Sequence, residues 1–562
     1  MKLSIFLKFG GFWALLGSIG FMLFVLTPVG VVFFRSFTTA RLGVNVGFTL
    51  QNYQEALNLS ALLPVMFNSF TYAIGCALLG TTVGAILAWI VARTNTPGKS
   101  LVELLPLYPI LMPPIAKTIA WITLLAPRSG ILNNALEGVT GTNIEFFNAF
   151  SIPAMIWVFG LALVPLAYLT MLPVLLSFDP ALEESAFVCS SGPLRTVLRI
   201  TLPLTFPAFV SIFILNFLRG LRSFTTPALM GSPGGIEVFI TKVFDAVEIG
   251  ANPGLATAYS SILVLIIVAV VLVYIRMVRV SQKFATVSGK GYRAHIVDIG
   301  KWKYLALAFV LVYFAVGILI PFVTLVILAL IPNYSYDAFI HFQSYVSLRS
   351  FQLIFSDPTF VSGFYNSLGI AAAAAGVGVM ISAVIAFLVH RVKSVWTKVF
   401  EIIGTLPIGL PDLILSLGLL LMFINTPLYG TVWLLVIALT VAYFPFALRS
   451  TSASVLSIKD ELEEAAWIHG GKWRHVFTKV TLPLLKPGLA AAFFFIFTDA
   501  MRSIEAAVLL ASPGSTFGPV TIFDYFNIGN WSPAAAGSVV YLVVLITVVT
   551  VAKYAFKIRF TL

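Results

Sequence analysis

Charged residues are scarce in this chain. They make up 10% of its 562 residues, whereas hydrophobic residues make up 59%. Soluble domains carry about a quarter charged residues, so this composition excludes an ordinary soluble protein. Cysteine is also scarce: Cys76 lies in an apolar run and Cys189 in a charged segment. Two cysteines placed in this way do not indicate a disulfide framework.

Motifs for catalysis and metal binding are lacking as well. The sequence Gly98-Lys99-Ser100 ends like a phosphate-binding loop, but Arg93 stands where the first glycine is required and no buried strand precedes it. No pair of nucleophile and base stands out. The five histidines do not have the spacing of metal ligands: they are His295, His341, His390, His469 and His475. We therefore expect no catalytic site, no metal site and no cofactor in this chain.

Long apolar runs are abundant instead. They predict an all-α polytopic membrane protein, because a transmembrane helix needs about 20 apolar residues and a transmembrane barrel would show short alternating segments. The first run, 10–34, is too long for the apolar part of a signal peptide, so we interpret it as an uncleaved span. Six spans are expected in each half, at 11–35, 66–92, 101–126, 151–177, 205–228 and 255–278, and at 304–331, 363–390, 399–424, 431–455, 485–510 and 533–555.

The basic residues predict the orientation. If the N-terminus is inside, most of the 34 Lys and Arg residues lie at cytoplasmic ends of spans, as expected in a bacterial inner membrane. The positive-inside rule then accounts for the net charge of +12, so we expect membrane lipid around the spans and no nucleic acid as a partner. Both termini are predicted to be cytoplasmic. The basic segment 281–303 is a cytoplasmic linker between halves 1–280 and 304–562, which share one orientation because each has an even number of spans.

The two halves repeat each other at constant offsets. Asn68-Ser69 and Pro109-x-x-x-Pro113 recur 298 residues later, as Asn366-Ser367 and Pro407-x-x-x-Pro411. Beyond the fourth spans the offset is 280, and it relates Pro207, Arg222-Ser223 and Ser232-Pro233-Gly234 to Pro487, Arg502-Ser503 and Ser512-Pro513-Gly514. Agreement at so many positions indicates an internal duplication.

A polar segment recurs after the fourth span of each half, at 179–203 and 457–483. In both copies a proline follows the second glutamate of a pair by 19 residues. In the first copy, Asp179 is expected to cap a helix that Gly192-Pro193 ends. In the second, Ser457 and Asp460 resemble a capping box, and Gly470-Gly471 is the break. We expect short, stiff helices outside the membrane, with exposed glutamates that dock as levers in a groove of a partner.

These segments resemble the EAA motif of permease subunits of type I ABC importers, whose usual form is Glu-Ala-Ala, three residues, Gly, and then Ile-x-Leu-Pro. The second copy, Glu464-Ala465-Ala466 with Gly470, fits this form well. The first copy departs from it, because Ser185 replaces the first alanine and Ser190 stands where glycine is expected. Within the family, one chain with two fused halves most resembles ferric-iron-type permeases, and residues 286–293 look like the linker of that subgroup.

The resemblance implies about twelve transmembrane helices in two tandem six-helix bundles. It also implies a homodimer of separate ABC ATPase subunits, which hold the ATP and Mg and rock the bundles between inward-open and outward-open states. A periplasmic or lipid-anchored binding protein would deliver the substrate. The residues expected to couple to the ATPases are Glu183, Glu184, Ala186, Gly192, Glu463, Glu464, Ala465, Ala466 and Gly470.

Ionisable residues inside the spans are candidates for the substrate pathway, because each costs roughly 2.5–3.5 kcal/mol to insert unless it lines a cavity or is paired. They are Lys117, Arg219, Arg222, Asp412, Asp499, Arg502 and Glu505. Two interpretations stay open: these groups line the pathway or a gate, or they form internal salt bridges, with Arg502 held by Asp499 or Glu505. The excess of one basic group favours an anion only weakly.

The resemblance implies ferric iron or a ferric-anion complex as the substrate. Importers of phosphonates or other phosphorylated small molecules, polyamines, thiamine and sulfate are the alternatives within the family. A twelve-span secondary transporter is the main rival from another class. It also has two six-span halves, but it does not need a matched glutamate-rich loop after each fourth span.

Overall fold

The structure is a computed structural model that describes residues 11–39, 47–142, 145–176, 193–196, 199–200, 202–282, 296, 298–392 and 394–555. Within these residues, ten helices are long and apolar enough to cross a membrane. Two further pairs of helices qualify as bent spans, which gives up to twelve. The predicted all-α polytopic fold is therefore confirmed, although the third and ninth spans are broken rather than straight.

The first half follows the expected order. Its long helices are α2 (Phe12–Ser36), α4 (Leu59–Arg93), α8 (Ile152–Leu176), α11 (Leu202–Arg222) and α13 (Pro253–Gln282). The broken third span consists of α5 (Lys99–Leu104), the 3₁₀ segment η1 (Leu105–Leu111) and α6 (Pro114–Leu125). Shorter elements connect them: α3 (Gln51–Ala56), α7 (Ile131–Thr140), α10 (Pro193–Thr196), η3 (Pro227–Gly231), η4 (Ser232–Gly234) and α12 (Phe239–Glu248).

The second half repeats this arrangement. Its first span is continuous through α14 (Trp302–Phe314), η5 (Ala315–Leu319) and α15 (Ile320–Leu330), and its other long helices are α19 (Pro358–Arg391), α22 (Val432–Ser457), α25 (Leu482–Arg502) and α27 (Trp531–Ala555). The broken ninth span consists of α20 (Val395–Thr405), η6 (Leu406–Gly409) and α21 (Asp412–Phe423). The shorter elements are α16 (Tyr336–Ile340), α17 (Phe342–Tyr345), α18 (Arg349–Ser356), α23 (Asp460–Ile468), α24 (Trp473–Val476), η7 (Phe477–Thr481) and α26 (Gly518–Asn527).

The repeated Pro-x-x-x-Pro motifs produce the two bends. A residue before proline is pushed out of the helical region, and Met112 and Leu410 are accordingly extended, with ψ of 123° and 140°. The chain turns by 93° in the first half and by 106° in the second. Hydropathy alone predicted straight spans here because both arms of each bend are apolar.

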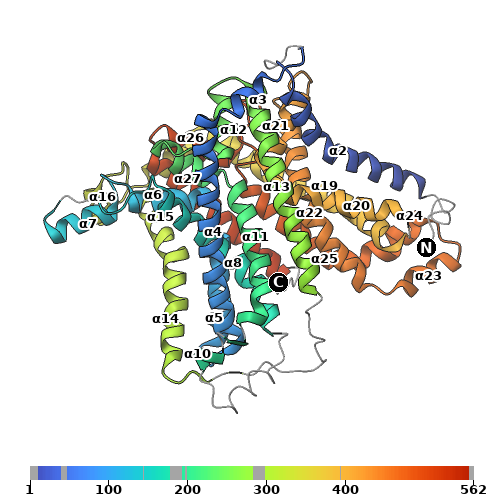
Figure 1. The fold of residues 1–562 in the computed structure, drawn as a ribbon, viewed down its shortest axis with the longest axis horizontal. Coiled ribbons are helices and arrows are strands. Elements are labelled where there is room, and N and C mark those ends of the chain that lie inside the picture. Colours follow the sequence, from blue (N-terminus) through green and yellow to red (C-terminus); the bar gives the residue numbers. More distant parts are fainter. Residues whose placement is uncertain are drawn as a thin grey trace.

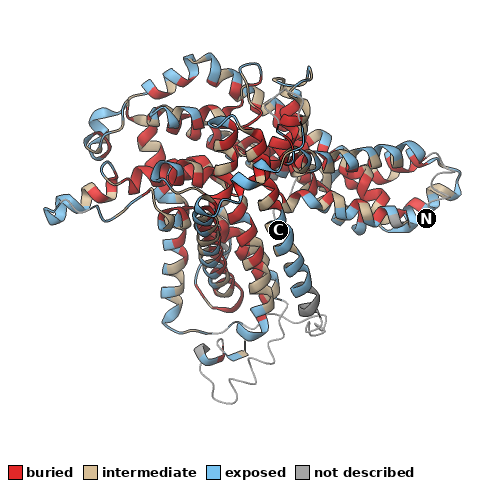
Figure 2. Cartoon of the chain, turned by 45° about the horizontal axis from the view of Figure 1, so that its top comes forward, coloured by how far each residue is buried: buried red, intermediate tan, exposed pale blue. Residues whose placement is uncertain are grey.

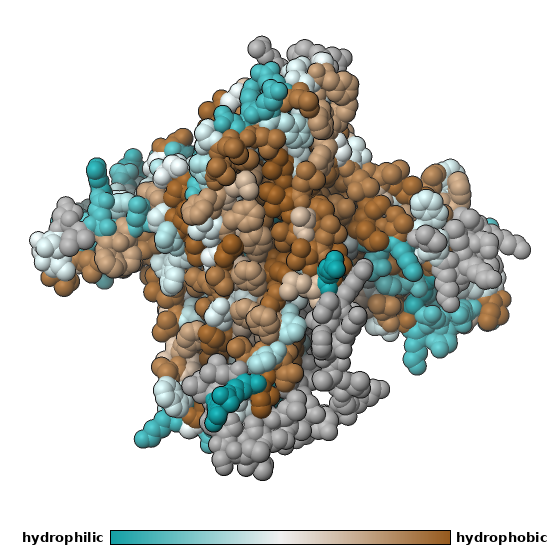
Figure 3. All heavy atoms as spheres, in the orientation of Figure 1, coloured by the Kyte–Doolittle hydropathy of each residue, from teal (hydrophilic) through white to brown (hydrophobic). Residues whose placement is uncertain are grey.

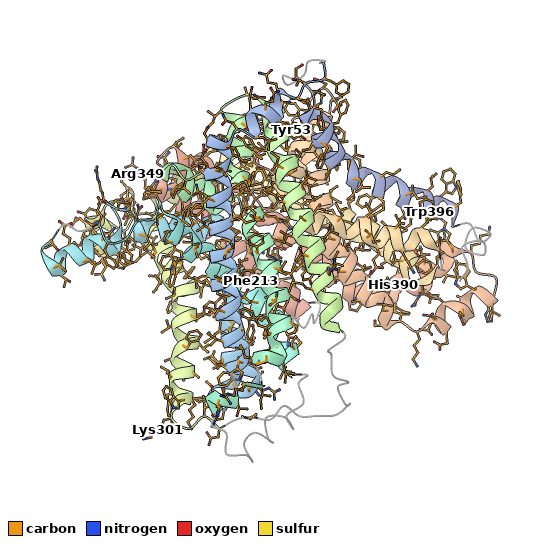
Figure 4. All side chains as sticks on the ribbon, in the orientation of Figure 1. Tyr53, Phe213, Lys301, Arg349, His390 and Trp396 are labelled. Atoms are coloured by element: carbon orange, nitrogen blue, oxygen red, sulfur yellow. The ribbon has the colours of Figure 1, made fainter. Side chains whose placement is uncertain are left out.

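The two bundles diverge from the region in which they meet (Figure 1). The helices α4, α5, α8 and α14 extend downward, whereas α19, α20, α22 and α25 extend to the right. As a result α10 and α23, which belong to the two EAA-like segments, lie at distant ends of the molecule. The labelled residues follow the same division: Lys301 lies at the bottom and Trp396 at the right, whereas Tyr53 is at the top (Figure 4).

The first helix of each half packs against the other half. The helix α2 packs along α21, and Gly418 approaches so closely that an added Cβ would overlap the Pro28 carbonyl group. In the same way α15 packs on α6, and a Cβ added at Gly317 would lie 3.2 Å from the ring of Pro109. Met22 of α2 even belongs to a hydrophobic core built otherwise from second-half residues. The packing of α2 on the second half and of α15 on the first half therefore holds the two bundles together.

Burial and hydropathy agree with a membrane protein. Buried residues concentrate in the bundles and where they meet, and the outward faces are exposed (Figure 2). Most of the visible surface is hydrophobic, with hydrophilic residues gathered at the extremities (Figure 3). Large apolar side chains such as Trp13 and Phe67 are 76% and 70% exposed. Lipid rather than water is the solvent in which such a surface is stable.

Candidate functional site

The two bends are held by arginines from the opposite half. At the end of α11, Arg222 donates from Nη1 to the carbonyl oxygen of Ile408 in η6. At the end of α25, Arg502 donates from Nη1 to the carbonyl oxygen of Ile110 in η1, at 2.5 Å. The two arginines are 280 residues apart and the two isoleucines 298 residues apart, so these contacts are repeat equivalents. We call them the arginine latches.

The prolines explain why these carbonyls need an outside donor. A helical carbonyl normally accepts from the N–H three or four residues later, and after Ile110 both of those positions, Pro113 and Pro114, are prolines without an N–H. Three residues after Ile408 stands Pro411. An unsatisfied carbonyl within a membrane is costly, so a guanidinium that reaches it stabilises the bend. A hydrogen bond to a charged donor contributes about 1.5–3 kcal/mol.

The carboxylate partners of the latches differ between the halves. Arg222 Nη2 lies 3.2 Å from Asp412 Oδ1, an ion pair between the halves. Arg502 Nη2 pairs with Asp499, three residues back on its own helix. Of the two partners that the sequence offered to Arg502, the structure therefore selects Asp499.

Glu505 has a partner on the first half. It accepts a hydrogen bond from Thr225 Oγ1 at 2.9 Å. These two residues are themselves repeat equivalents, 280 apart. A residue can contact its own equivalent only close to the repeat axis, so the latches lie around that axis. Glu505 also lies beyond the end of α25 at Arg502, so the span expected at 485–510 is present but ends earlier than predicted.

The other two candidates have contrasting environments. Lys117 is buried in α6 and donates from Nζ to the carbonyl oxygen of Pro109 at 3.2 Å. Arg219, one turn before Arg222, is exposed. Arg219 lies within electrostatic range of the latch residues Arg222, Arg502, Asp412 and Asp499.

An aromatic cluster joins the halves just beyond the latches. Phe224, two residues after Arg222, is fully buried, and its ring lies 4.9 Å from that of Phe244 in α12 and 6.0 Å from that of Phe523 in α26. The rings of Phe244 and Phe523 are 6.5 Å apart. The helices α12 and α26, which carry Phe244 and Phe523, lie at the end of the molecule remote from α10 and α23 (Figure 1). The cluster therefore joins the two halves at that end.

The repeated Asn-Ser pairs explain how α12 and α26 are placed. Ser69 Oγ accepts from the backbone N of Phe239, and Ser367 Oγ accepts from the backbone N of Gly518, both at 2.9 Å. The side-chain amides of Asn68 and Asn366 donate to the carbonyls of Glu237 and Thr516, both at 3.1 Å. Both halves thus tie the segment before the short helix to the second span of the half by the same bonds.

The second EAA segment has the predicted break. The helix α23 ends at Ile468, and Gly470 has a φ of +78°, a left-handed conformation that favours glycine. Beyond it lies α24, so the expected pair of short helices is confirmed. The capping box is wrong: Ser457 is the last residue of α22, and Asp460 is the first residue of α23 rather than part of a cap.

Glu463 is not exposed, contrary to the sequence prediction. Its Oε2 lies 2.7 Å from Arg391 Nε at the end of α19, and its Oε1 accepts from Thr481 Oγ1 at 2.9 Å. Burial raises the pKa of the Glu463 carboxyl, and the guanidinium of Arg391 and the Thr481 hydroxyl oppose this rise. Glu464 and Ala465 are exposed and Ala466 is half-buried. The face of α23 available to a partner is therefore the Glu464–Ala465 face.

Arg391 is the organising residue of this loop. Besides Glu463, it pairs with Asp460 and donates from Nη2 to the carbonyls of Val455 and Ile458 at 3.0 and 2.7 Å. Sequence reasoning missed this role because Arg391 lies at a span end, 72 residues before Glu463. Its repeat equivalent at the 298 offset, Arg93, is fully buried at the end of α4. The recurrence of arginine at this position in both halves is the sequence feature that could have indicated the role of Arg391.

Aromatic residues add to this anchoring. The ring of Trp473 in α24 lies 5.3 Å from Phe477 and 6.3 Å from Phe387 of α19. The region is marked by His390 and Trp396 at the right of Figure 4. The second loop is therefore rigidly attached to the second span of its half.

Four predicted coupling residues, Glu183, Glu184, Ala186 and Gly192, lie outside the described residues. In the part that the structure describes, no group of three His, Cys, Asp or Glu residues could hold a metal ion.

Known proteins resemble this chain over both halves. The family model described as "Binding-protein-dependent transport system inner membrane component" matches residues 80–286 and again 376–561. The putative ferric transport system permease protein FbpB 1 of Haemophilus influenzae is 25% identical over 482 residues, which cover 83% of this chain and 73% of that protein. The Fe(3+)-transport system permease protein FbpB 2 of the same organism is 26% identical over 494 residues, covering 86% and 88%.

A third relative extends over nearly the whole chain. The ferric transport system permease protein FbpB of Actinobacillus pleuropneumoniae is 22% identical over 533 residues, covering 94% of this chain and 75% of that protein. The first family match covers most of the first half and ends at residue 286 in the predicted linker, and the second match lies within the second half. The chain belongs to the family of binding-protein-dependent transport system inner membrane components, as an ABC importer permease with two halves fused in one polypeptide.

Proposed function

We propose that this chain forms the membrane pathway of an ATP-driven importer of ferric iron or of a ferric-anion complex. Two separate ATPase subunits drive it from the cytoplasm, and a binding protein delivers substrate from outside. The observation that carries the mechanism is the pair of arginine latches around the repeat axis. The names of the full-length relatives support iron as the substrate.

The latches and the aromatic cluster act as the outer gate. They hold the halves together at one end of the axis, while the bundles diverge toward α10 and α23 (Figure 1). With α10 and α23 on the predicted cytoplasmic side, this arrangement supports an inward-facing state. When ATP closes the ATPase dimer, the two loops are drawn together, the bundles rock, and the latches break on the outer side.

The second loop is suited to transmit this motion. Arg391 and the aromatic contacts of Trp473 tie α23 and α24 to α19, so a displacement of α23 moves α19 with it. The exposed Glu464 and Ala465 remain available to the ATPase.

Reconstitution with the cognate ATPase and binding protein in proteoliposomes tests the proposal. We expect uptake of ⁵⁵Fe that requires both partners and ATP. Competition by excess phosphonate, sulfate, polyamine or thiamine should leave iron uptake unchanged. Uptake sustained by an ion gradient without the ATPase would contradict the mechanism, and absence of iron uptake would contradict the substrate.

Capture of the ATPase in detergent tests the docking face. Ala465→Arg should abolish capture, because a long charged side chain then projects from the exposed face of α23. The matched control is Val139→Arg on α7, where Val139 is 87% exposed. It lies between the third and fourth expected spans, which is the external side if the N-terminus is inside. Equal capture by the two variants would place the docking surface elsewhere.

A further inference from the structure

Arg219 is an ionisable residue of a membrane-spanning helix that is exposed rather than paired. Among the described residues it has no hydrogen bond or ion pair, whereas Arg222 and Arg502 have both. A cation within a span costs roughly 2.5–3.5 kcal/mol on insertion scales and ordinarily faces water or a partner. The position of Arg219 therefore needs an explanation beyond the stability of the fold.

The side chain faces the space between the halves, not the lipid. The charged groups within its electrostatic range are Arg222 of its own helix, Asp499 and Arg502 of α25, and Asp412 of α21. They come from both halves and surround the repeat axis. The packed faces of α11 contact α4, α8 and α13 of its own half.

A stripe of unburied residues continues from Arg219 along α11. Leu215, Ser211, Ala208 and Leu204 follow at helical spacing, each exposed or half-buried. The stripe leads to the end of α11 nearest α10. The helix, marked by Phe213, runs through the middle of the molecule in Figure 4. Arg219 is thus the outermost exposed side chain on a surface that opens toward the predicted cytoplasmic side.

The charge at this position is not repeated in the second half. The equivalent of Arg219 at the 280 offset is Asp499, which is occupied by Arg502. Asp412 is occupied by Arg222, and Glu505 accepts from Thr225. Lys117 is buried against the Pro109 carbonyl. Among the intramembrane charges described, Arg219 is the one that is both exposed and without a partner.

We propose that Arg219 binds an oxyanion group of the substrate, a carboxylate or a phosphate, as it crosses the membrane. This inference rests on the proposed function and specifies its substrate. A guanidinium forms paired hydrogen bonds with such groups. A bare Fe³⁺ ion would be repelled by Arg219, since like charges repel strongly away from bulk water. Ferric iron therefore passes this point with its oxyanion ligands still attached.

Transport and ATP hydrolysis, measured together in proteoliposomes with the ATPase and binding protein, test this proposal. We expect Arg219→Ala to lower ⁵⁵Fe uptake at least tenfold while ATP hydrolysis stimulated by the binding protein stays within twofold of wild type. Arg219→Lys should retain part of the uptake, and Arg219→Glu should retain none. The matched control is Ser211→Ala on the same stripe, which should transport normally.

A binding measurement separates this inference from the proposed function. Purified full-length chain should gain thermal stability in sodium citrate or sodium phosphate relative to chloride at equal ionic strength, and Arg219→Ala should lose that gain. Absence of iron uptake by wild-type vesicles would contradict the proposed function and leave this measurement intact. Unchanged iron uptake in Arg219→Ala, equal anion stabilisation of both proteins, or a parallel loss of ATP hydrolysis would overturn the role of Arg219.

Discussion

The two arginine latches share one contact and differ in the other. Arg222 and Arg502 each reach the carbonyl of the isoleucine before the bend of the opposite half. Arg222 then pairs with Asp412 across the interface, whereas Arg502 pairs with Asp499 on its own helix. The backbone contact follows from the repeated prolines, so it is kept in both halves. The ion pair depends on single side chains, so it could change in one half alone.

This difference shows which latch contacts are common to both halves and which are specific to one half. The carbonyl contacts compensate for helical donors that prolines remove, both of the usual two after Ile110 and one of the two after Ile408. The carboxylates Asp412 and Asp499 neutralise the latch arginines. Neither carboxylate pairs with Arg219, which stays exposed on the first-half side of the axis.

Removing Arg222 should have the largest effect. Arg222→Ala leaves Asp412 without its partner and breaks the ion pair between the halves, which in buried pairs costs about 3–5 kcal/mol. Arg502→Ala loses its carbonyl contact with the other half, but its ion pair lies within one helix. We expect both variants to raise ATP hydrolysis in the absence of binding protein, Arg222→Ala by more. Equal increases would show that the location of the ion pair has no effect on ATP hydrolysis.

The packing of α2 on the second half can be tested at Gly418. A Cβ at this position would overlap the Pro28 carbonyl group of α2, so Gly418→Ala should lower stability by about 1–3 kcal/mol. The first half already has alanine at the equivalent position, Ala120. Thermal unfolding in detergent measures the effect. Gly369→Ala on α19, where an added Cβ meets nothing within 4 Å, is the control. An unchanged midpoint for Gly418→Ala would contradict the close packing of α2.

The Asn-Ser pairs should behave alike in the two halves. Ser69→Ala and Ser367→Ala each remove one acceptor for a buried backbone N–H, at a cost of about 1 kcal/mol. Because the geometry is the same, we expect the two midpoints of thermal unfolding to fall equally. A clear difference between the variants would mean that α12 and α26 are not held in equivalent ways.

The smallest expected effect is a pH dependence at Glu463. Burial raises the pKa of its carboxyl above the ordinary value of 4.5, so the folded chain binds the proton more readily than the unfolded chain. Its contribution to stability therefore falls as pH rises through the window between the ordinary and the raised pKa. The measurement is the midpoint of thermal unfolding of wild type and of Glu463→Gln across that window. We expect the wild type to lose stability relative to the variant as pH increases. Parallel curves would contradict the raised pKa.

Much of the fold could be predicted from the sequence. Hydropathy was sufficient to predict the membrane spans. Constant offsets were sufficient to predict the duplication, because Asn68-Ser69 and the paired prolines make the same local contacts in both halves. The bends could not be predicted from hydropathy, since Met112 and Leu410 connect arms that are equally apolar. The left-handed Gly470 was recognisable because few other residues adopt that conformation.

The site was harder to predict, because its contacts join residues far apart in the chain. The candidates Arg222 and Arg502 were identified by their cost in a membrane, but their acceptors are backbone carbonyls with no sequence signature of their own. Glu463 was predicted to be exposed from its polarity alone. Its burial depends on Arg391, which belongs to another span.

The unequal charges around the axis imply that neither half could assemble with a copy of itself. Two first halves would set Arg219 against Arg219 and offer Arg222 a proline, Pro114, where the second half has Asp412. Two second halves would gather six carboxylates around two arginines. Each half therefore depends on the other for its counter-charges, and fusion into a single chain supplies the two halves in equal number.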